Sequence, residues 1–172
     1  MGLMEKAAAT EFIGLEFATW LYWQSEKSAG KLRLQGLDEF DCWFEAPVEL
    51  TAEYGDATTI TLKGGTPLES PEARRALLEN KKIAKAHLRI IWQNQTFTFA
   101  FRASNFAVSG LKLPVPPKSG GDYLDLRFEM FEAFEKFWGQ VLDHFLTLRL
   151  NDKAWRPERK RMSDWVKSFE GK

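Results

Sequence analysis

The sequence has almost none of the residues from which disulfide frameworks and zinc sites are built. Of its 172 residues, one is a cysteine, Cys42, and two are histidines, His87 and His144. One cysteine cannot form a disulfide within the chain and is typical of a reducing compartment. These three residues are also too few for a common tetrahedral zinc site. We therefore expect no metal site, structural roles for Cys42 and His144, and a cytoplasmic location.

Long apolar runs are absent as well. The most apolar stretch, residues 12–23, is shorter than the roughly 20 residues that a membrane-spanning helix needs. It also lacks the basic segment and small-residue cleavage site of a signal peptide. We predict that the protein does not associate with a membrane.

Catalytic motifs are missing too. Residues 63–66, Lys-Gly-Gly-Thr, have the composition of a phosphate-binding loop without its spacing, and no Gly-x-Ser-x-Gly or His-Glu-x-x-His motif occurs. The acidic residues 38–41 have no matching acidic cluster elsewhere and are interpreted as a solvated turn. We predict that the protein is not an enzyme and uses no cofactor, and a metal-dependent nuclease is the weakest alternative.

What the sequence does contain is an uneven distribution of charge. The net charge is zero, but residues 1–70 hold five Lys/Arg against twelve Asp/Glu, and residues 71–172 hold nineteen against twelve. Such asymmetry favours an anionic partner for the basic half. The alternative is internal neutralisation, in which acidic elements pack beside basic ones.

Aromatic residues are abundant, with seven Trp and fourteen Phe. Residues 12–23 wound as a helix have no clearly polar face, which is typical of a buried helix. We expect Trp20, Trp23 and Trp138 to stabilise the fold or an interface between chains. The lone acid Glu16 needs a partner when buried. The candidate partners are Arg74, Arg75 and Arg149.

The pattern of apolar residues predicts a single α+β domain over residues 1–172. We expect an antiparallel sheet of about 5–6 strands, packed on one face by helices that include one long C-terminal helix. The expected strands are residues 31–35, 41–54, 58–63, 83–92, 96–102 and 106–113, with a turn at residues 55–56 and, at Pro47, a break or an edge position. Residues 83–92 and 96–102 are expected to form a hairpin whose core face is marked by strict alternation of Ala84, Ala86, Leu88, Ile90 and Trp92 and of Phe97, Phe99 and Phe101. The expected helices are residues 10–27, a short one after Ser70, 123–150 and 157–169. Residues 1–9 and the loop 114–121 are expected to be flexible.

Two groups of cations are candidate anion-binding sites. Lys85, Arg89 and Arg102 fall on the polar face of the predicted hairpin, where they resemble phosphate-positioning contacts. A second group crowds the start of the last helix, if Pro157 opens that helix. Its members are Arg156, Arg159, Lys160 and Arg161. Cations there oppose the helix dipole, which favours an anion bound at that end. The alternative for both groups is an ordinary solvated basic surface.

Several motifs resemble the C-terminal half of the recombination-associated RdgC-like proteins. They are Phe-Ile-Gly-Leu-Glu-Phe-Ala-Thr-Trp-Leu-Tyr-Trp at residues 12–23, Glu-Ala-Arg-Arg-Ala-Leu at 72–77 with Lys-Lys-Ile at 81–83, Gly-Leu-Lys-Leu-Pro at 110–114, and Phe-Leu-Thr-Leu-Arg at 145–149 followed by Trp155 and Trp165. The resemblance spans about residues 12–166. It implies sequence-nonspecific binding of duplex DNA, control of recombinase access to that DNA, and homodimers. The chain is much shorter than full-length members, whose N-terminal portion it does not resemble.

The leading functional prediction is therefore a non-catalytic DNA-binding module of RdgC-like type, self-associating and nucleoid-associated in the cytoplasm. Its predicted phosphate contacts are Lys85, Arg89, Arg102, Arg156, Arg159, Lys160 and Arg161. The alternative is a protein–protein interaction subunit without DNA binding. In that alternative an aromatic-rich surface formed by Trp20, Trp23, Trp138 and Trp155 contacts the partner, and the basic residues meet an acidic protein.

Overall fold

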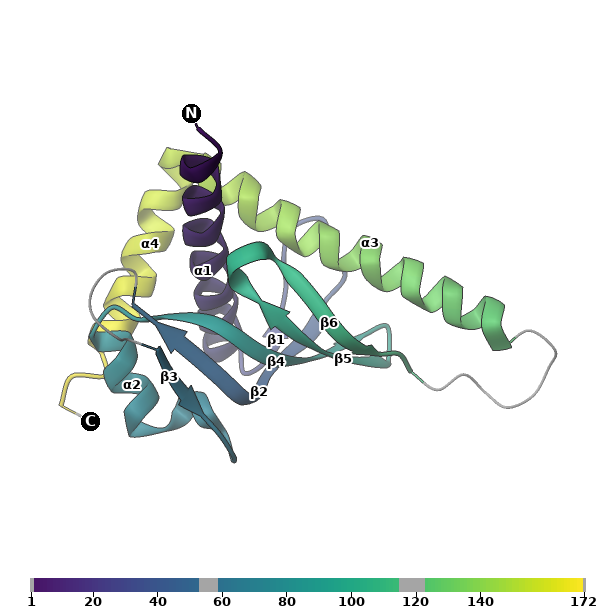
Figure 1. Cartoon of the computed structure of the whole chain (residues 1–172), viewed down its shortest axis with the longest axis horizontal. Coiled ribbons are helices and arrows are strands. Elements are labelled where there is room, and N and C mark those ends of the chain that lie inside the picture. The colour runs from purple at the N-terminus through teal and green to yellow at the C-terminus, as the bar shows by residue number, and fades with distance from the viewer. Residues whose placement is uncertain (1, 53–58, 115–122, 172) are drawn as a thin grey trace.

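A computed structural model describes residues 2–52, 59–114 and 123–171. The chain is an α+β protein in which one antiparallel sheet carries its helices on one face, as predicted (Figure 1). The strands are β1 (Lys31–Leu32), β2 (Phe40–Thr51), β3 (Thr59–Leu62), β4 (Lys82–Trp92), β5 (Gln95–Arg102) and β6 (Ala107–Lys112). Their order is β1-β2-β4-β5-β6, and β3 pairs with the second half of β2.

The helices are α1 (Leu3–Lys27), α2 (Pro71–Leu78), α3 (Tyr123–Leu150) and α4 (Asp152–Lys167), with short 3₁₀ turns η1 (Pro67–Glu69) and η2 (Ala103–Asn105). The start of α2 follows the expected chemistry, because Ser70 accepts a bond from the backbone N–H of Ala73 and Pro71 occupies the first helical position. The expected start of α1 at Thr10 is wrong, since the helix already begins at Leu3. The expected flexible loop 114–121 lies, after Pro114, outside the described residues.

The hairpin of β4 and β5 forms the centre of the sheet. Gln93 and Asn94 join the strands with φ angles of 50° and 58°, the left-handed geometry of a two-residue hairpin turn. Phe97, Phe99 and Phe101 alternate onto the inner face and are at most 1% exposed. On β4 the expected alternation fails at one end. A register shift opposite Glu49 and Leu50 buries Ile83 in place of Ala84.

Strand β2 is an inner strand with an irregularity at Pro47. Of the two alternatives expected at Pro47, a break or an edge position, the structure shows a break. The register with β4 shifts between Glu45 and Val48. On either side of the shift, Cys42 and Val48 lie in the core and are 0% exposed. The turn expected at residues 55–56 lies outside the described residues.

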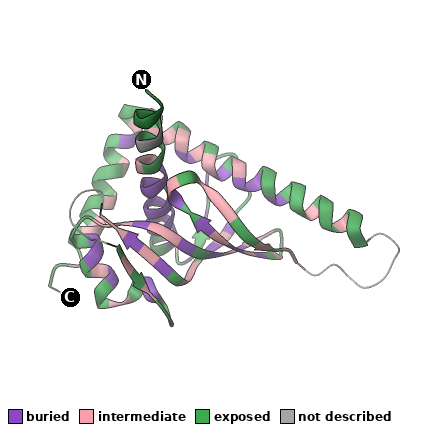
Figure 2. Cartoon of the chain, in the orientation of Figure 1, coloured by how far each residue is buried: buried purple, intermediate pink, exposed green. Residues whose placement is uncertain are grey.

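Helix α1 packs on the sheet and contacts both α3 and α4 on its other sides (Figure 2). Phe17 shows how it does so, because its ring contacts Phe101 on β5 and both Trp138 and Phe145 on α3. Gly14 allows the closest approach: a Cβ atom there would lie 1.8 Å from the carbonyl oxygen of Ala103 in η2. The missing side chain at Gly14 thus lets the backbone of η2 approach the helix.

Helices α3 and α4 complete the helical layer. The second half of α3 covers the sheet through Phe134 and Phe137, whose rings pack on Phe97 and Trp92. Helix α4 packs outside α1 and α3, with Trp155 perpendicular to the ring of Phe145. The first turns of α3 extend past the sheet (Figure 1).

Candidate anion-binding cleft

The first predicted site lies on the outer face of the sheet, where β4 presents Lys85 and Arg89. The register places Glu49 of β2 opposite Lys85, and Arg102 of β5 on its other side. Arg89 donates a hydrogen bond from Nε to Oε1 of Glu45 over 2.6 Å. The cations of this outer sheet face are therefore interleaved with acids from β2, which is the internal neutralisation considered as the alternative.

The second predicted site does not lie at a helix N-terminus. Helix α4 begins at Asp152, and the side chain of Asn151 caps it by accepting from the N–H of Ala154 over 3.2 Å. Pro157 lies inside the helix instead of opening it. The expectation that Pro157 opens this helix is therefore wrong, and the four cations do not lie in an N-terminal turn. Trp155, two residues before the proline, is buried.

The four predicted cations of α4 differ in their surroundings. Arg161 pairs with Glu158, and Lys160 pairs with Asp164, where the lysine lowers the pKa of the carboxyl group. Arg156 and Arg159 form no ion pair with any side chain in the described ranges. The exposed side of this helix thus carries cations that the fold does not neutralise.

Arg159 also lines a cleft between α4, α1 and the turn from α2 into β4. We call it the basic cleft, and its volume is about 390 Å³. Its walls combine apolar side chains with four cations and two acids, Glu16 and Glu170. The apolar residues are Phe12, Leu77, Leu78, Met162 and Val166, and the cations are Lys81, Lys82, Arg159 and Lys167. A neighbouring hollow on α4 shares Arg159 and Lys167 and adds Arg156 and Lys160.

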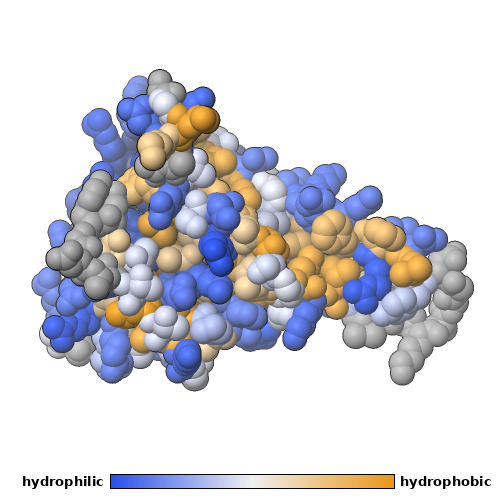
Figure 3. Space-filling model, viewed as in Figure 1, coloured by the Kyte–Doolittle hydropathy of each residue, from blue (hydrophilic) through white to orange (hydrophobic). Residues whose placement is uncertain are grey.

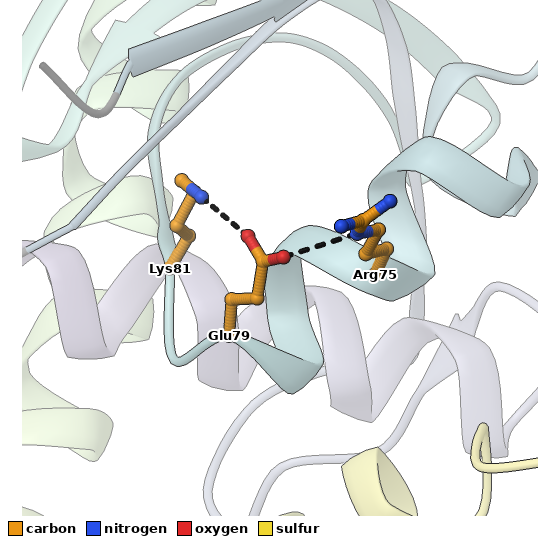
Figure 4. A network of polar contacts seen from close by, with 3 residues as sticks. All are labelled: Arg75, Glu79 and Lys81. Atoms are coloured by element: carbon orange, nitrogen blue, oxygen red, sulfur yellow. Dashed lines mark hydrogen bonds and ion pairs between the residues drawn. The ribbon is translucent and has the colours of Figure 1, made fainter.

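The cations of the cleft are not equivalent. Lys81 is held by Glu79, which accepts from its Nζ over 2.8 Å and from Nε of Arg75 over 3.0 Å (Figure 4). These two partners lower the pKa of the Glu79 carboxyl group. Lys82 instead lies over the ring of Phe12, 5.5 Å from its centre. In the part of the chain that the structure describes, Lys82 and Lys167 have no carboxylate partner.

Glu16 lies at the inner side of the basic cleft and is 6% exposed. Nε of Arg149 donates to its carboxylate over 2.5 Å, so Arg149 is the partner among the three candidates. The guanidinium of Arg149 also lies over the ring of Trp155. This pair joins α1 to the last turn of α3 beneath the start of α4. Glu16 is therefore a packing residue whose charge is already compensated.

The tryptophans predicted for the fold or an interface are all buried within the chain. Trp20 is 1% exposed, Trp23 4% and Trp138 5%, and Trp155, from the alternative prediction, is 4% exposed. The indole N–H of Trp20 donates to Glu158 over 3.2 Å. These side chains build the core, so an aromatic surface formed by them is excluded.

A hollow of about 500 Å³ beside α3 contains His144. The imidazole stacks on Trp20, and burial lowers its pKa. The acidic turn that contains Asp38 and Glu39 lies on the surface, where Glu39 pairs with Arg33. Within residues 2–52, 59–114 and 123–171, no three His, Cys, Asp or Glu side chains are grouped to hold a metal ion.

Lys81, Lys82 and Lys167 were missed as site residues by the sequence reasoning. The lysine pair directly follows Asn80, whose φ of 64° turns the chain out of α2 and into β4. Lys167 is four residues from Ser163 and eight from Arg159, so all three lie on one face of α4. The helical spacing could have revealed Lys167, whereas the cleft itself depends on how three elements meet.

Comparison with protein-family models and with curated proteins finds no match. The resemblance to RdgC-like proteins therefore stays a prediction. In the ranges that the structure describes, no helix combines the length and the apolar character needed to cross a membrane.

Proposed function

We propose that the protein binds the phosphate backbone of duplex DNA, without sequence preference, through the basic cleft and the exposed side of α4. The observation that carries this proposal is the grouping of Arg156, Arg159, Lys82 and Lys167, none of which pairs with a carboxylate of the described chain. Phosphate oxygens would supply the missing counter-charge.

The spacing of the cations on α4 suits an extended anion better than a single small one. From Arg156 to Lys167 the helix rises about 16 Å, the distance over which one strand of B-DNA presents about five phosphates. Cations that contact phosphate groups fix the position of a duplex, but they do not read its base sequence. The binding is therefore sequence-nonspecific.

The resemblance to RdgC-like proteins supports the same ligand. From this resemblance we also propose that the protein acts in recombination, that it is located at the nucleoid in the cytoplasm, and that its role is not catalytic. The outer sheet face takes no part in this proposal, because Glu45 and Glu49 alternate with its cations. Lys85, Arg89 and Arg102 therefore provide an internal control for the contribution of net charge.

The test is fluorescence anisotropy of a labelled random duplex at about 50 and about 200 mM salt. One variant carries Arg156→Gln, Arg159→Gln and Lys167→Gln, and the matched control carries Lys85→Gln, Arg89→Gln and Arg102→Gln. Both remove three positive charges. We expect the first to weaken binding and to flatten the salt dependence by about 0.9 in log–log slope for each lost phosphate contact. We expect the control to bind nearly as the parent does.

Equal weakening by both triple variants would mean that only net charge matters, and no binding at the lower salt concentration would overturn the proposal. Binding that is indifferent to salt would also contradict it, because release of counterions from DNA makes phosphate contacts salt-dependent.

A further inference from the structure

The projecting end of α3, residues 123–131, exposes a group of large apolar side chains. The exposed fractions are 68% for Leu124, 66% for Phe128, 45% for Phe131 and 50% for Tyr123. With Leu113 after β6, three of these residues line a shallow hollow of about 290 Å³. Figure 3 shows hydrophobic residues along this end of the helix, beyond the edge of the sheet.

The size of this group requires an explanation. An aromatic side chain presents about 150–250 Å², so the four exposed residues offer roughly 400 Å² of apolar surface. This area is similar to that of the largest exposed apolar patch on a typical monomer, and such patches are often functional. Leu124, Phe128 and Phe131 follow the spacing of one helix face. This face is of the kind that a second helix covers.

The charged residues around this face indicate which kind of partner would bind it. Four exposed acids accompany it on the same helix: Asp125, Glu129, Glu132 and Glu135. At about 100° per residue, Asp125 and Glu132 flank Phe128 on one side. Two exposed cations accompany the four acids: Arg127 borders the other side and donates to the hydroxyl of Tyr123 over 3.2 Å, and Lys136 follows Glu132 by one turn. The rim is therefore mainly acidic.

A second copy of the chain fits this rim poorly in either orientation. In an antiparallel pair of α3 ends, the edges that carry Asp125 and Glu132 would meet each other. In a parallel pair, Phe128 would face its own copy, and two turns later Glu135 would face its own copy as well. Like charges brought together at an interface disfavour association.

We propose that the projecting end of α3 is a docking site for an amphipathic helix of another protein, one with apolar anchors and basic flanks. Its anchors cover Leu124, Phe128 and Phe131, and its lysines or arginines meet the acidic edge. This site lies on a different helix from the cations of α4 and does not depend on DNA binding.

The test uses two synthetic helices of about 18 residues, one of leucine and lysine and one of leucine and glutamate, long enough to form several turns. Binding is measured by anisotropy of the labelled peptides. We expect the lysine peptide to bind at least about tenfold more tightly than the glutamate peptide. Leu124→Ser with Phe128→Ser should weaken it at least about tenfold, because two anchors are lost.

The control replaces Leu3 and Met4 by serine, since these residues are 87% and 89% exposed at the other end of the molecule. It should bind the peptide as the parent does. Asp125→Asn with Glu132→Gln should weaken only the lysine peptide. Equal binding of both peptides, no binding, or an unchanged affinity in the Leu124/Phe128 variant would overturn the proposal. A dimer in light scattering that the same variant converts to a monomer would overturn it in favour of a second copy.

Discussion

Helices α1 and α3 are similar in length and in richness of aromatic residues, yet they are buried differently. From Leu15 to Ser25, every residue of α1 is buried, including Glu16 and Gln24. On α3, burial is confined to one stripe that begins at Phe134 and ends at Phe145. Before that stripe, Phe128 and its neighbours are exposed. Apolar composition alone therefore does not determine whether a helix is buried. Burial depends on which other elements pack around the helix.

The difference has a simple structural origin. Helix α1 has the sheet on one side and both α3 and α4 on the others, so it has no solvent side over three turns. Helix α3 contacts the sheet and α1 along its middle and α4 near its end, and its first turns extend past all of them (Figure 2). One helix thus forms the centre of the core, and the other forms an outer layer with a free end.

The largest expected effect contrasts the two parts of α3. Phe145 is 0% exposed and packs on Phe17, Trp20 and Trp155, so Phe145→Ala should lower the free energy of unfolding by about 3–5 kcal/mol. Phe128→Ala should change it by less than about 0.5 kcal/mol. Urea unfolding followed by tryptophan fluorescence measures both.

If Phe145→Ala does not fold, Phe145→Leu can be measured instead. It should lower the free energy of unfolding by less, since leucine keeps most of the buried volume. A loss for Phe128→Ala as large as that for the Phe145 variants would show that the projecting end is packed in solution, and the contrast within α3 would then fail.

The next effect contrasts one glycine on each helix. A Cβ atom at Gly14 would meet the backbone carbonyl of Ala103, whereas one at Gly139 meets nothing within 4 Å. Gly14→Ala should therefore lower the free energy of unfolding by about 3 kcal/mol, because two backbones must separate. Gly139→Ala should raise it by about 0.5–1 kcal/mol, since alanine favours the helix. Thermal unfolding of the two variants should shift in opposite directions, and shifts of the same sign would contradict the close packing of α1.

These contrasts show which parts of the structure the sequence could predict. Alternation of Phe97, Phe99 and Phe101 predicted the hairpin, because period-two patterning is local, and the bounds of α3 were predicted from its own periodicity. The start of α4 was missed because Pro157 suggested a first turn, while Asn151 supplied the cap. Local signals thus predicted most elements and misplaced the starts of two helices, α1 and α4.

The candidate site was less predictable, because its charges are balanced by neighbours that lie far away in the sequence. On α4 the pairs of Lys160 and Arg161 are three or four residues apart and could be found by spacing. On the outer sheet face, Arg89 is paired with Glu45 of another strand, and only the register shows this. The same holds for Lys82 and Arg159, which come together only in the folded chain.

The smallest expected effect concerns the acid at the centre of α1. Glu16→Gln leaves Arg149, which is 24% exposed, without its counter-charge, so we expect the free energy of unfolding to fall by about 1–3 kcal/mol. Glu132→Gln, on the exposed part of α3, should change it by less than about 0.5 kcal/mol. Urea unfolding at low and high salt measures both, and the loss at Glu16 should persist in salt because the pair is mostly shielded from solvent.

A double-mutant cycle with Arg149→Gln separates the pair from the general cost of changing a buried residue. If Glu16 acts through Arg149, the double variant should be less destabilised than the sum of the two single variants. Strict additivity, or unchanged stability in Glu16→Gln, would show that the pair does not stabilise the contact between α1 and the last turn of α3. The burial of α1 would then depend on its aromatic side chains alone.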